Sequence, residues 1–204
     1  AKIELSDGGQ PAAVDKVGFI NMPIHSLWSQ VDVFLQQKAT STGTGNNYPM
    51  KAYIETLLGY GKDAKESKLT SGLYYEDTGS IDATDPTSGA NIGFTQRWVL
   101  TRGGAVVDME GHLHHDLCQQ NRYILNGVSI GIKLWPTKDS FRLMCGEKDK
   151  TYKVTLLDVH LRVCKVNVTP AVMVAHDKVL STIPAKYPYQ QTNIKVFTLS
   201  AGQF

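Results

Sequence analysis

The stretch Ala105–Cys118 (AVVDMEGHLHHDLC) shows the clearest alternation of apolar and polar residues in the chain. One parity carries apolar or small residues: Ala105, Val107, Met109, Gly111, Leu113 and Leu117. The other parity is mostly polar: Val106, Asp108, Glu110, His112, His114 and Asp116. Successive side chains point to opposite faces of a β-strand, so this period of two predicts a strand with one core face and one polar face.

Working outward, other segments repeat this period. Strands are predicted over residues 27–35, 94–100, 128–135, 152–168 and 192–199, with shorter apolar pieces at 123–125 and 141–144. Asn126-Gly127 predicts a tight turn that joins two of them into a hairpin, because both residues tolerate positive φ.

Two segments carry the helical period instead. In the first, Pro49 precedes apolar residues at helical spacing between Met50 and Leu58, and this apolar stripe is predicted to be a packing face. In the second, Thr169 is the predicted N-cap and Pro170 the first-turn residue of a helix that ends before Pro184. A short turn is predicted over 63–68, and long loops over 40–47 and 77–93.

About eight strands with helices confined to the connections predict an all-β fold. We expect an eight-stranded antiparallel jelly-roll sandwich with short helices in the connecting loops, forming a single domain over residues 1–204. An immunoglobulin-like sandwich is the alternative, because Cys118 and Cys164 flank Trp135, but the helical insertions do not suit that fold.

Composition narrows the functional classes. The net charge of +2 argues against a dedicated nucleic-acid binder, and no apolar run is long enough for a membrane span. Cys118, Cys145 and Cys164 are too few for a disulfide-stapled secreted scaffold, so a reducing compartment is expected. Because the chain starts at Ala1 without a methionine, the sequence suggests a piece of a longer polypeptide.

One cluster could carry chemistry. Strand alternation would place His112, His114 and Asp116 on one face, and His-x-His is a true metal-ligand spacing. Jelly-roll cupin enzymes use such a pair, but the following acid is missing and Val106 occupies the place of the expected glycine. The favoured interpretation is a polar surface with hydrogen-bonded histidines. We therefore predict no catalytic, cofactor or metal residues, and keep these three only as metal candidates.

The remaining histidines and cysteines are expected to have structural roles. Cys164 and His160 could form a nucleophilic pair on one strand face, although such pairs normally come from separate elements, and a structural cysteine is favoured. His25 is expected to be a packed histidine.

Several dispersed motifs occur together in the same order. They are Ser26–Leu35, Asn47–Leu58, Gly111–His114, Asn121–Val128, Lys138–Phe141 and Ala185–Pro188. Together they make the chain resemble the major capsid proteins of Polinton (Maverick) elements and adintoviruses. The resemblance runs through nearly the whole sequence, although no single motif is diagnostic.

The resemblance implies a double jelly roll, of which this sequence matches only the first half, with an incomplete N-terminus. It implies a non-enzymatic role as a structural subunit of an icosahedral virion, assembled inside the host cell. The implied partners are other capsid subunits: a homotrimeric capsomer, neighbouring capsomers and penton or minor capsid proteins. No cofactor, direct nucleic-acid contact or transmembrane segment is expected.

Two alternatives stay open. One is a metal-dependent cupin-like enzyme centred on His112, His114 and Asp116. The other is a carbohydrate-binding or attachment sandwich, which predicts exposed aromatic side chains in a line, with Trp28, Trp98 and Trp135 as its candidates.

Overall fold

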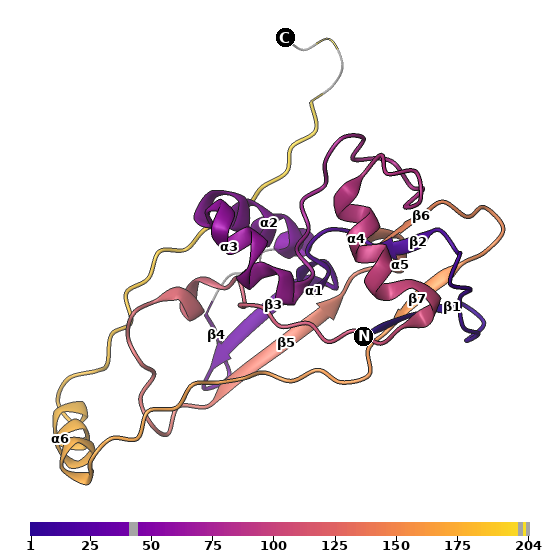
Figure 1. Ribbon diagram of the computed structural model, residues 1–204. Coiled ribbons are helices and arrows are strands. Elements are labelled where there is room, and N and C mark those ends of the chain that lie inside the picture. The colour runs from indigo at the N-terminus through magenta and orange to yellow at the C-terminus, as the bar shows by residue number, and fades with distance from the viewer. Residues whose placement is uncertain (41–44, 200–201, 203–204) are drawn as a thin grey trace.

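The computed structural model describes residues 1–40, 45–199 and 202, and it mixes short strands with helices (Figure 1). The strands are β1 (Lys2–Leu5), β2 (Val17–Phe19), β3 (Trp28–Leu35), β4 (Lys38–Ala39), β5 (Ile130–Pro136), β6 (Leu143–Cys145) and β7 (Tyr152–Thr155). The α-helices are α1 (Pro23–Ser26), α2 (Tyr48–Gly59), α3 (Lys62–Glu66), α4 (Ile92–Thr101), α5 (Asp139–Arg142) and α6 (Pro170–Leu180). Short 3-10 helices are η1 (Gly45–Asn47), η2 (Lys68–Gly72), η3 (Arg102–Gly104) and η4 (Asp116–Gln119).

The strands form three small antiparallel sheets. β1 pairs with β7, β2 pairs with β6, and β3 lies between β4 and β5. Over the described residues no sheet has more than three strands. The predicted all-β, eight-stranded jelly-roll sandwich is therefore wrong, and so is the description of residues 1–204 as a jelly-roll domain.

The predicted strand over 94–100 is in fact the helix α4. The side chain of Asn91 caps it, accepting a hydrogen bond from the backbone N–H of Phe94 at 3.1 Å. The buried positions Phe94, Trp98 and Thr101 follow helical spacing, with Arg97 among them. The apolar residues that suggested a strand are split between this buried face and solvent, so the period was misread.

The predicted strand over 105–118 is also wrong. Residues 105–115 run irregularly and end in η4. Isolated contacts hold this segment: Val107 exchanges two backbone hydrogen bonds with Ala1, and the N–H of Glu110 donates to the carbonyl of Ser71. His114 and His115 are both buried although they are consecutive, which a strand with one wet face does not allow.

Other predictions are confirmed. β3 and β5 form where alternation predicted them, and Val31 and Val33 of β3 are buried. α2, α3 and α6 also lie where expected, although the Thr169 side chain makes no cap hydrogen bond. The predicted hairpin is only half formed, because residues 123–125 are not a strand. Residues 156–168 and 192–199 contain no strand either, and residues 41–44 of the first predicted loop lie outside the described residues.

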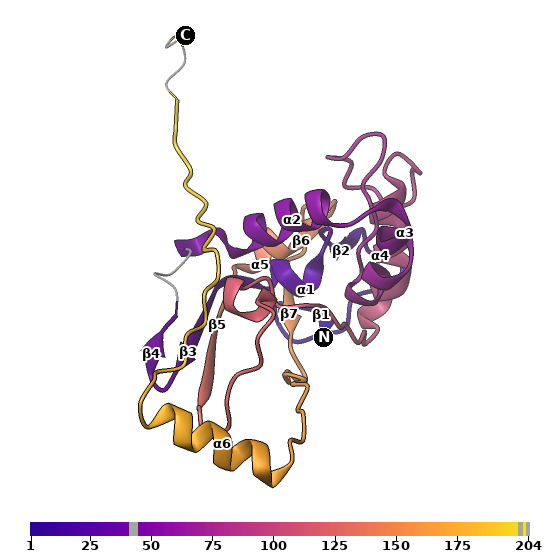
Figure 2. The same ribbon diagram turned by 90° about the vertical axis from the view of Figure 1, so that its left-hand side faces the viewer.

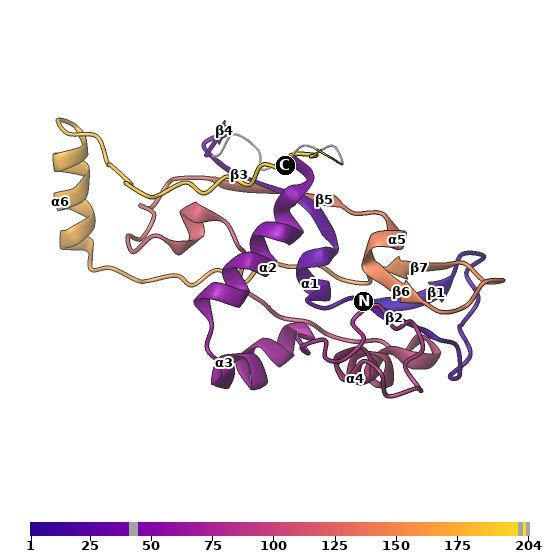
Figure 3. The same cartoon turned by 90° about the horizontal axis from the view of Figure 1, so that it is seen from above.

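Two clusters of buried apolar residues lie among the described residues. One joins the sheets of β1 and β2 around Ile3, Val17, Phe19 and Tyr152. The second lies under α2 and consists of Met22, Ala52 and Tyr74. α2 packs on β3, as Figure 3 shows from above, whereas α6 stands apart from the other elements in Figures 1 and 3.

Gly93 in the first turn of α4 allows a close backbone approach. A Cβ at this position would lie 2.4 Å from the carbonyl oxygen of Glu76 and 2.7 Å from that of Tyr75. We predict that Gly93→Ala lowers the free energy of unfolding by about 1–3 kcal/mol, the usual cost of overpacking. Urea unfolding measures it. Gly59→Ala is the matched control, because a Cβ there meets nothing within 4 Å. Equal responses of the two variants would contradict the prediction.

Candidate functional site

Helix α2 buries a polar face and exposes an apolar one. Lys51 and Thr56 are 2% and 1% exposed, and Ala52 between them is fully buried. The solvent-facing residues form the α2 stripe, with exposed fractions from 37% to 85%: Met50, Tyr53, Ile54, Leu57 and Leu58. The prediction that this stripe is a packing face of the chain is therefore wrong. Tertiary contacts of Lys51 decide the orientation of the helix.

Lys51 holds two carboxylates at the inner face of α2. Its Nζ lies 2.5 Å from Oδ1 of Asp116 and 3.6 Å from Oε1 of Glu55, one helical turn further along. The Lys51 side chain is 3% exposed and that of Asp116 is 9% exposed. Buried ions of this kind need partners, so this group ties η4 to α2.

His114 completes the buried polar cluster. Its Nδ1 lies 2.8 Å from Oε2 of Glu55, and its Nε2 lies 3.4 Å from Oγ1 of Thr56. Its backbone N–H donates to the hydroxyl of Tyr48 at 3.4 Å. The His114 side chain is 6% exposed. Both ring nitrogens contact side chains of α2, so the imidazole is turned toward this helix.

His25 from α1 packs edge-to-face against His114, with ring centroids 4.7 Å apart. Its Nδ1 lies 3.1 Å from the hydroxyl of Tyr48. Burial, with smaller effects from His114 and His112, lowers the pKa of His25 to about 3. The imidazole is therefore neutral in the folded protein at physiological pH, and the expectation of a packed histidine is confirmed.

This pKa predicts a loss of stability in acid. The unfolded chain binds a proton at His25 below about pH 6.5, whereas the folded chain does not until about pH 3. The free energy of unfolding should therefore fall by about 1.4 kcal/mol for each pH unit below 6.5, as far as pH 3, and be insensitive to this group above 6.5.

Urea midpoints at pH 7 and pH 5 measure this dependence. His25→Gln should flatten it, and His160→Gln should not, because His160 is 61% exposed at the side chain. An unchanged slope in His25→Gln would refute the assignment.

The three metal candidates do not converge on one point. His112 is exposed, His114 bonds to Glu55, and Asp116 pairs with Lys51. In residues 1–40, 45–199 and 202, no group of three or more His, Cys, Asp or Glu side chains is arranged to hold a metal ion.

Sequence reasoning did not identify Lys51, Glu55, Tyr48 or Thr56 as part of this cluster. The signal was present, since Lys51 and Glu55 lie four residues apart and off the apolar stripe.

The other candidates are also separate. His160 and Cys164 are both exposed, and His160 lies 3.2 Å from Asp158. All three cysteines are free thiols. Of the three tryptophans, Trp98 is 7% exposed, Trp28 is half-buried and Trp135 is 51% exposed, so they do not form one exposed line.

The polar cluster also anchors the last part of the chain. We call residues 157–199 the C-terminal arm. Its backbone N–H at Thr192 donates to Oδ2 of Asp116 at 3.0 Å, so one carboxylate contacts both Lys51 and the arm. Further contacts join Arg122 to the carbonyl of Lys186 and the hydroxyl of Tyr189 to the carbonyl of Thr40.

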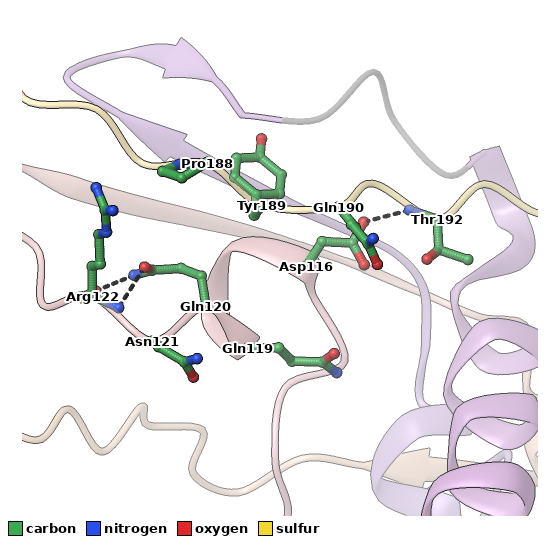
Figure 4. A pocket seen from close by; sticks show the side chains of 9 residues that line it. All are labelled: Asp116, Gln119, Gln120, Asn121, Arg122, Pro188, Tyr189, Gln190 and Thr192. Atoms are coloured by element: carbon green, nitrogen blue, oxygen red, sulfur yellow. Dashed lines mark hydrogen bonds between the residues drawn. The ribbon is translucent and has the colours of Figure 1, made fainter.

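A polar pocket of about 390 Å³ lies between η4 and the arm (Figure 4). It is lined by Asp116, Gln119, Gln120, Asn121, Arg122, Pro188, Tyr189, Gln190 and Thr192. Figure 4 shows Asp116 facing Thr192 and Gln120 turned toward the backbone of Arg122, to which it hydrogen-bonds. Several of the lining groups thus already have partners within the chain.

Beyond these anchors the arm is exposed. Every residue from 157 to 186 is exposed, and α6 buries none of its side chains. The large apolar side chains that face solvent are Leu157, Val159, Leu161, Val163, Val166, Val168, Val172, Met173, Val174, Val179, Leu180, Ile183, Val196, Phe197 and Leu199. An apolar surface of this extent usually marks a contact with another protein.

Comparison with known proteins shows a similarity to one Caenorhabditis elegans protein. The chain is 24% identical over 207 residues to "Uncharacterized protein F54H12.2" of Caenorhabditis elegans, covering 95% of this chain and 45% of that protein. The chain thus spans somewhat less than half the length of this relative. No family model and no solved structure matches the chain. Among the described residues, no helix is both long and apolar enough to cross a membrane.

Proposed function

We propose that this protein is a structural subunit of a viral capsid and that its work is done by contacts with other capsid subunits. The α2 stripe carries this proposal. Five apolar side chains at helical spacing face solvent on a helix that its buried polar side fixes in place. A fixed apolar helix face of this kind suits a groove on another subunit.

Two further features support an assembly role. The arm presents many more apolar side chains, and its exposed helix α6 stands apart from the other helices and strands (Figures 1 and 3). The dispersed motifs that resemble Polinton and adintovirus major capsid proteins suggest the same role, with a homotrimeric capsomer as the first assembly and the virion as its location. The proposal excludes the jelly-roll fold, which the structure contradicts.

Electron microscopy of the purified protein tests the proposal. We expect closed shells or discrete capsomers in the wild-type protein. Ile54→Glu combined with Leu57→Glu should reduce the assembled fraction at least about tenfold, because burying two new charges costs more than 1.4 kcal/mol. The urea midpoint should not change, since both side chains are already exposed.

Lys62→Glu is the control, because Lys62 is 82% exposed and lies outside the α2 stripe. Unassembled wild-type protein would contradict the proposal, as would unchanged assembly of the α2 variant.

A further inference from the structure

The sheet of β3, β4 and β5 has an open edge. β5 is the outermost strand of this sheet. β3 pairs with one side of β5, and no strand among the described residues pairs with the opposite side of β5. On β5, Ile132 and Leu134 stand opposite Val33 and Val31 and extend that apolar face. Lys133 and Trp135 lie on the other face, where the indole Nε1 of Trp135 donates to Asp32 at 2.9 Å. An exposed edge of this kind accepts another strand readily.

The first part of the arm has the pattern of a strand but pairs with no strand among the described residues, although the Arg162 side chain bonds to Glu110 at 3.0 Å. Residues 157–163 alternate, with Leu157, Val159 and Leu161 on one parity and charged or polar residues between them. The four apolar residues of this segment, Val163 included, are 50% to 55% exposed. The segment is extended in Figure 1 but joins no sheet. The segment therefore has the side-chain alternation of a strand, but its backbone is not part of a β-ladder.

The two features match in one antiparallel register. If Asp158 stands opposite Lys133, then Leu157, Val159 and Leu161 stand opposite Leu134, Ile132 and Ile130. The apolar residues then continue the face that contains Val31 and Val33, and the opposite charges of Asp158 and Lys133 meet on the other face. Moving the register by two residues would bring His160 or Leu156 opposite Lys133 and lose the charge pair.

The same chain does not provide this pairing. Residues 119–128 pass between β5 and the part of the arm that precedes α6 in both perpendicular views (Figures 2 and 3). This segment is tied to other parts of the chain, because Gln119 bonds to Glu55 and Arg122 bonds to the carbonyl of Lys186, which follows α6. The open edge and the unpaired segment are therefore complementary but separated within one molecule.

We propose that residues 157–163 add as an antiparallel strand to the free edge of β5 in a second copy of this chain. Each copy then donates one segment and accepts another, which is a head-to-tail contact able to close into a ring such as a capsomer. The inference rests on the proposed function in taking a second copy as the partner, and it concerns a surface different from the α2 stripe.

Cysteine cross-linking between two separately labelled proteins tests the register. In a background with Cys118→Ser and Cys164→Ser, one protein carries Val159→Cys and the other carries Ile132→Cys. A second mixture combines Asp158→Cys with Lys133→Cys. Opposed residues in an antiparallel ladder alternate between hydrogen-bonded and non-hydrogen-bonded pairs, and these two kinds of pair differ in how readily they form a disulfide. The control combines Val159→Cys with Lys133→Cys, whose side chains would point to opposite faces.

We expect about tenfold more disulfide-linked heterodimer in at least one matched mixture than in the control, because Cβ vectors that point apart cannot be bridged. Asp158→Lys should weaken self-association, and adding Lys133→Asp in the same protein should restore it. Equal cross-linking in all mixtures would overturn the inference. So would a bridge that forms only when both cysteines are in one chain.

The two proposals fail separately. Cross-linked copies that build neither shells nor discrete capsomers would support this contact and contradict the capsid role. Shells without the cross-link would do the reverse.

Discussion

Arg97→Ala should lower the free energy of unfolding by about 3–5 kcal/mol, the usual effect of removing one member of a buried charged network. The Arg97 side chain is fully buried. Its Nε donates to the carbonyl of Phe19 at 2.9 Å, its Nη1 to that of Tyr75 at 2.6 Å, and its Nη2 to Asp77 at 2.6 Å. One guanidinium thus connects α4 with β2 and with the loop after η2, and its loss removes this donor from the carbonyls of Phe19 and Tyr75 and from the carboxylate of Asp77.

Urea unfolding followed by circular dichroism measures this effect. Arg97→Lys should lose most of the same stability, because a single ammonium cannot reproduce the planar guanidinium fork. Arg102→Ala is the matched control, since Arg102 is exposed and its guanidinium lies 5.3 Å from the ring centroid of Trp98. A loss below about 1 kcal/mol in Arg97→Ala, similar to that in the control, would contradict the structural role.

Lys51→Ala is the second large effect that we expect. Removing the ammonium leaves the carboxylates of Asp116 and Glu55 without a cation at a largely buried site. The free energy of unfolding should therefore fall by about 3–5 kcal/mol. Because Asp116 also accepts the backbone N–H of Thr192, the arm should loosen as well. Trypsin should then cleave faster after Lys186 and Lys195.

Lys62→Ala supplies a control with matching geometry. Lys62 also has a glutamate four residues on, Glu66, and the Nζ–Oε1 distance of 3.6 Å is the same as between Lys51 and Glu55. The pair is exposed, so its loss should cost no more than about 0.5 kcal/mol. If both lysine variants lost the same small amount of stability, burial of the Lys51 cluster would not matter to the fold.

The sequence predicted correctly where local signals agree with the final packing. Alternation over β3 matches the burial of Val31 and Val33, and the first-turn prolines mark α2 and α6. These patterns depend on residues close in sequence, which a period can detect.

Prediction failed where contacts distant in sequence decide the structure. The alternation of residues 105–118 looks like a strand, but His114 is buried against Glu55 and the next residue, His115, is buried as well. α4 was misread because Arg97, a residue type that is usually exposed, is buried by partners from two other segments, β2 and the loop after η2. The apolar stripe of α2 faces solvent because Lys51, on the opposite side of the helix, pairs with the buried carboxylate of Asp116. The sequence thus shows the polar residues of the site, but it does not show which distant residues they pair with.

The mass of the native protein in solution tests the assembly role most directly. Sedimentation velocity of the wild-type chain should show a discrete oligomer or larger shells, with the assembled fraction rising with protein concentration. The variants of the α2 stripe and of the arm should each reduce it without changing the urea midpoint. A single monomeric species at all concentrations would contradict the account.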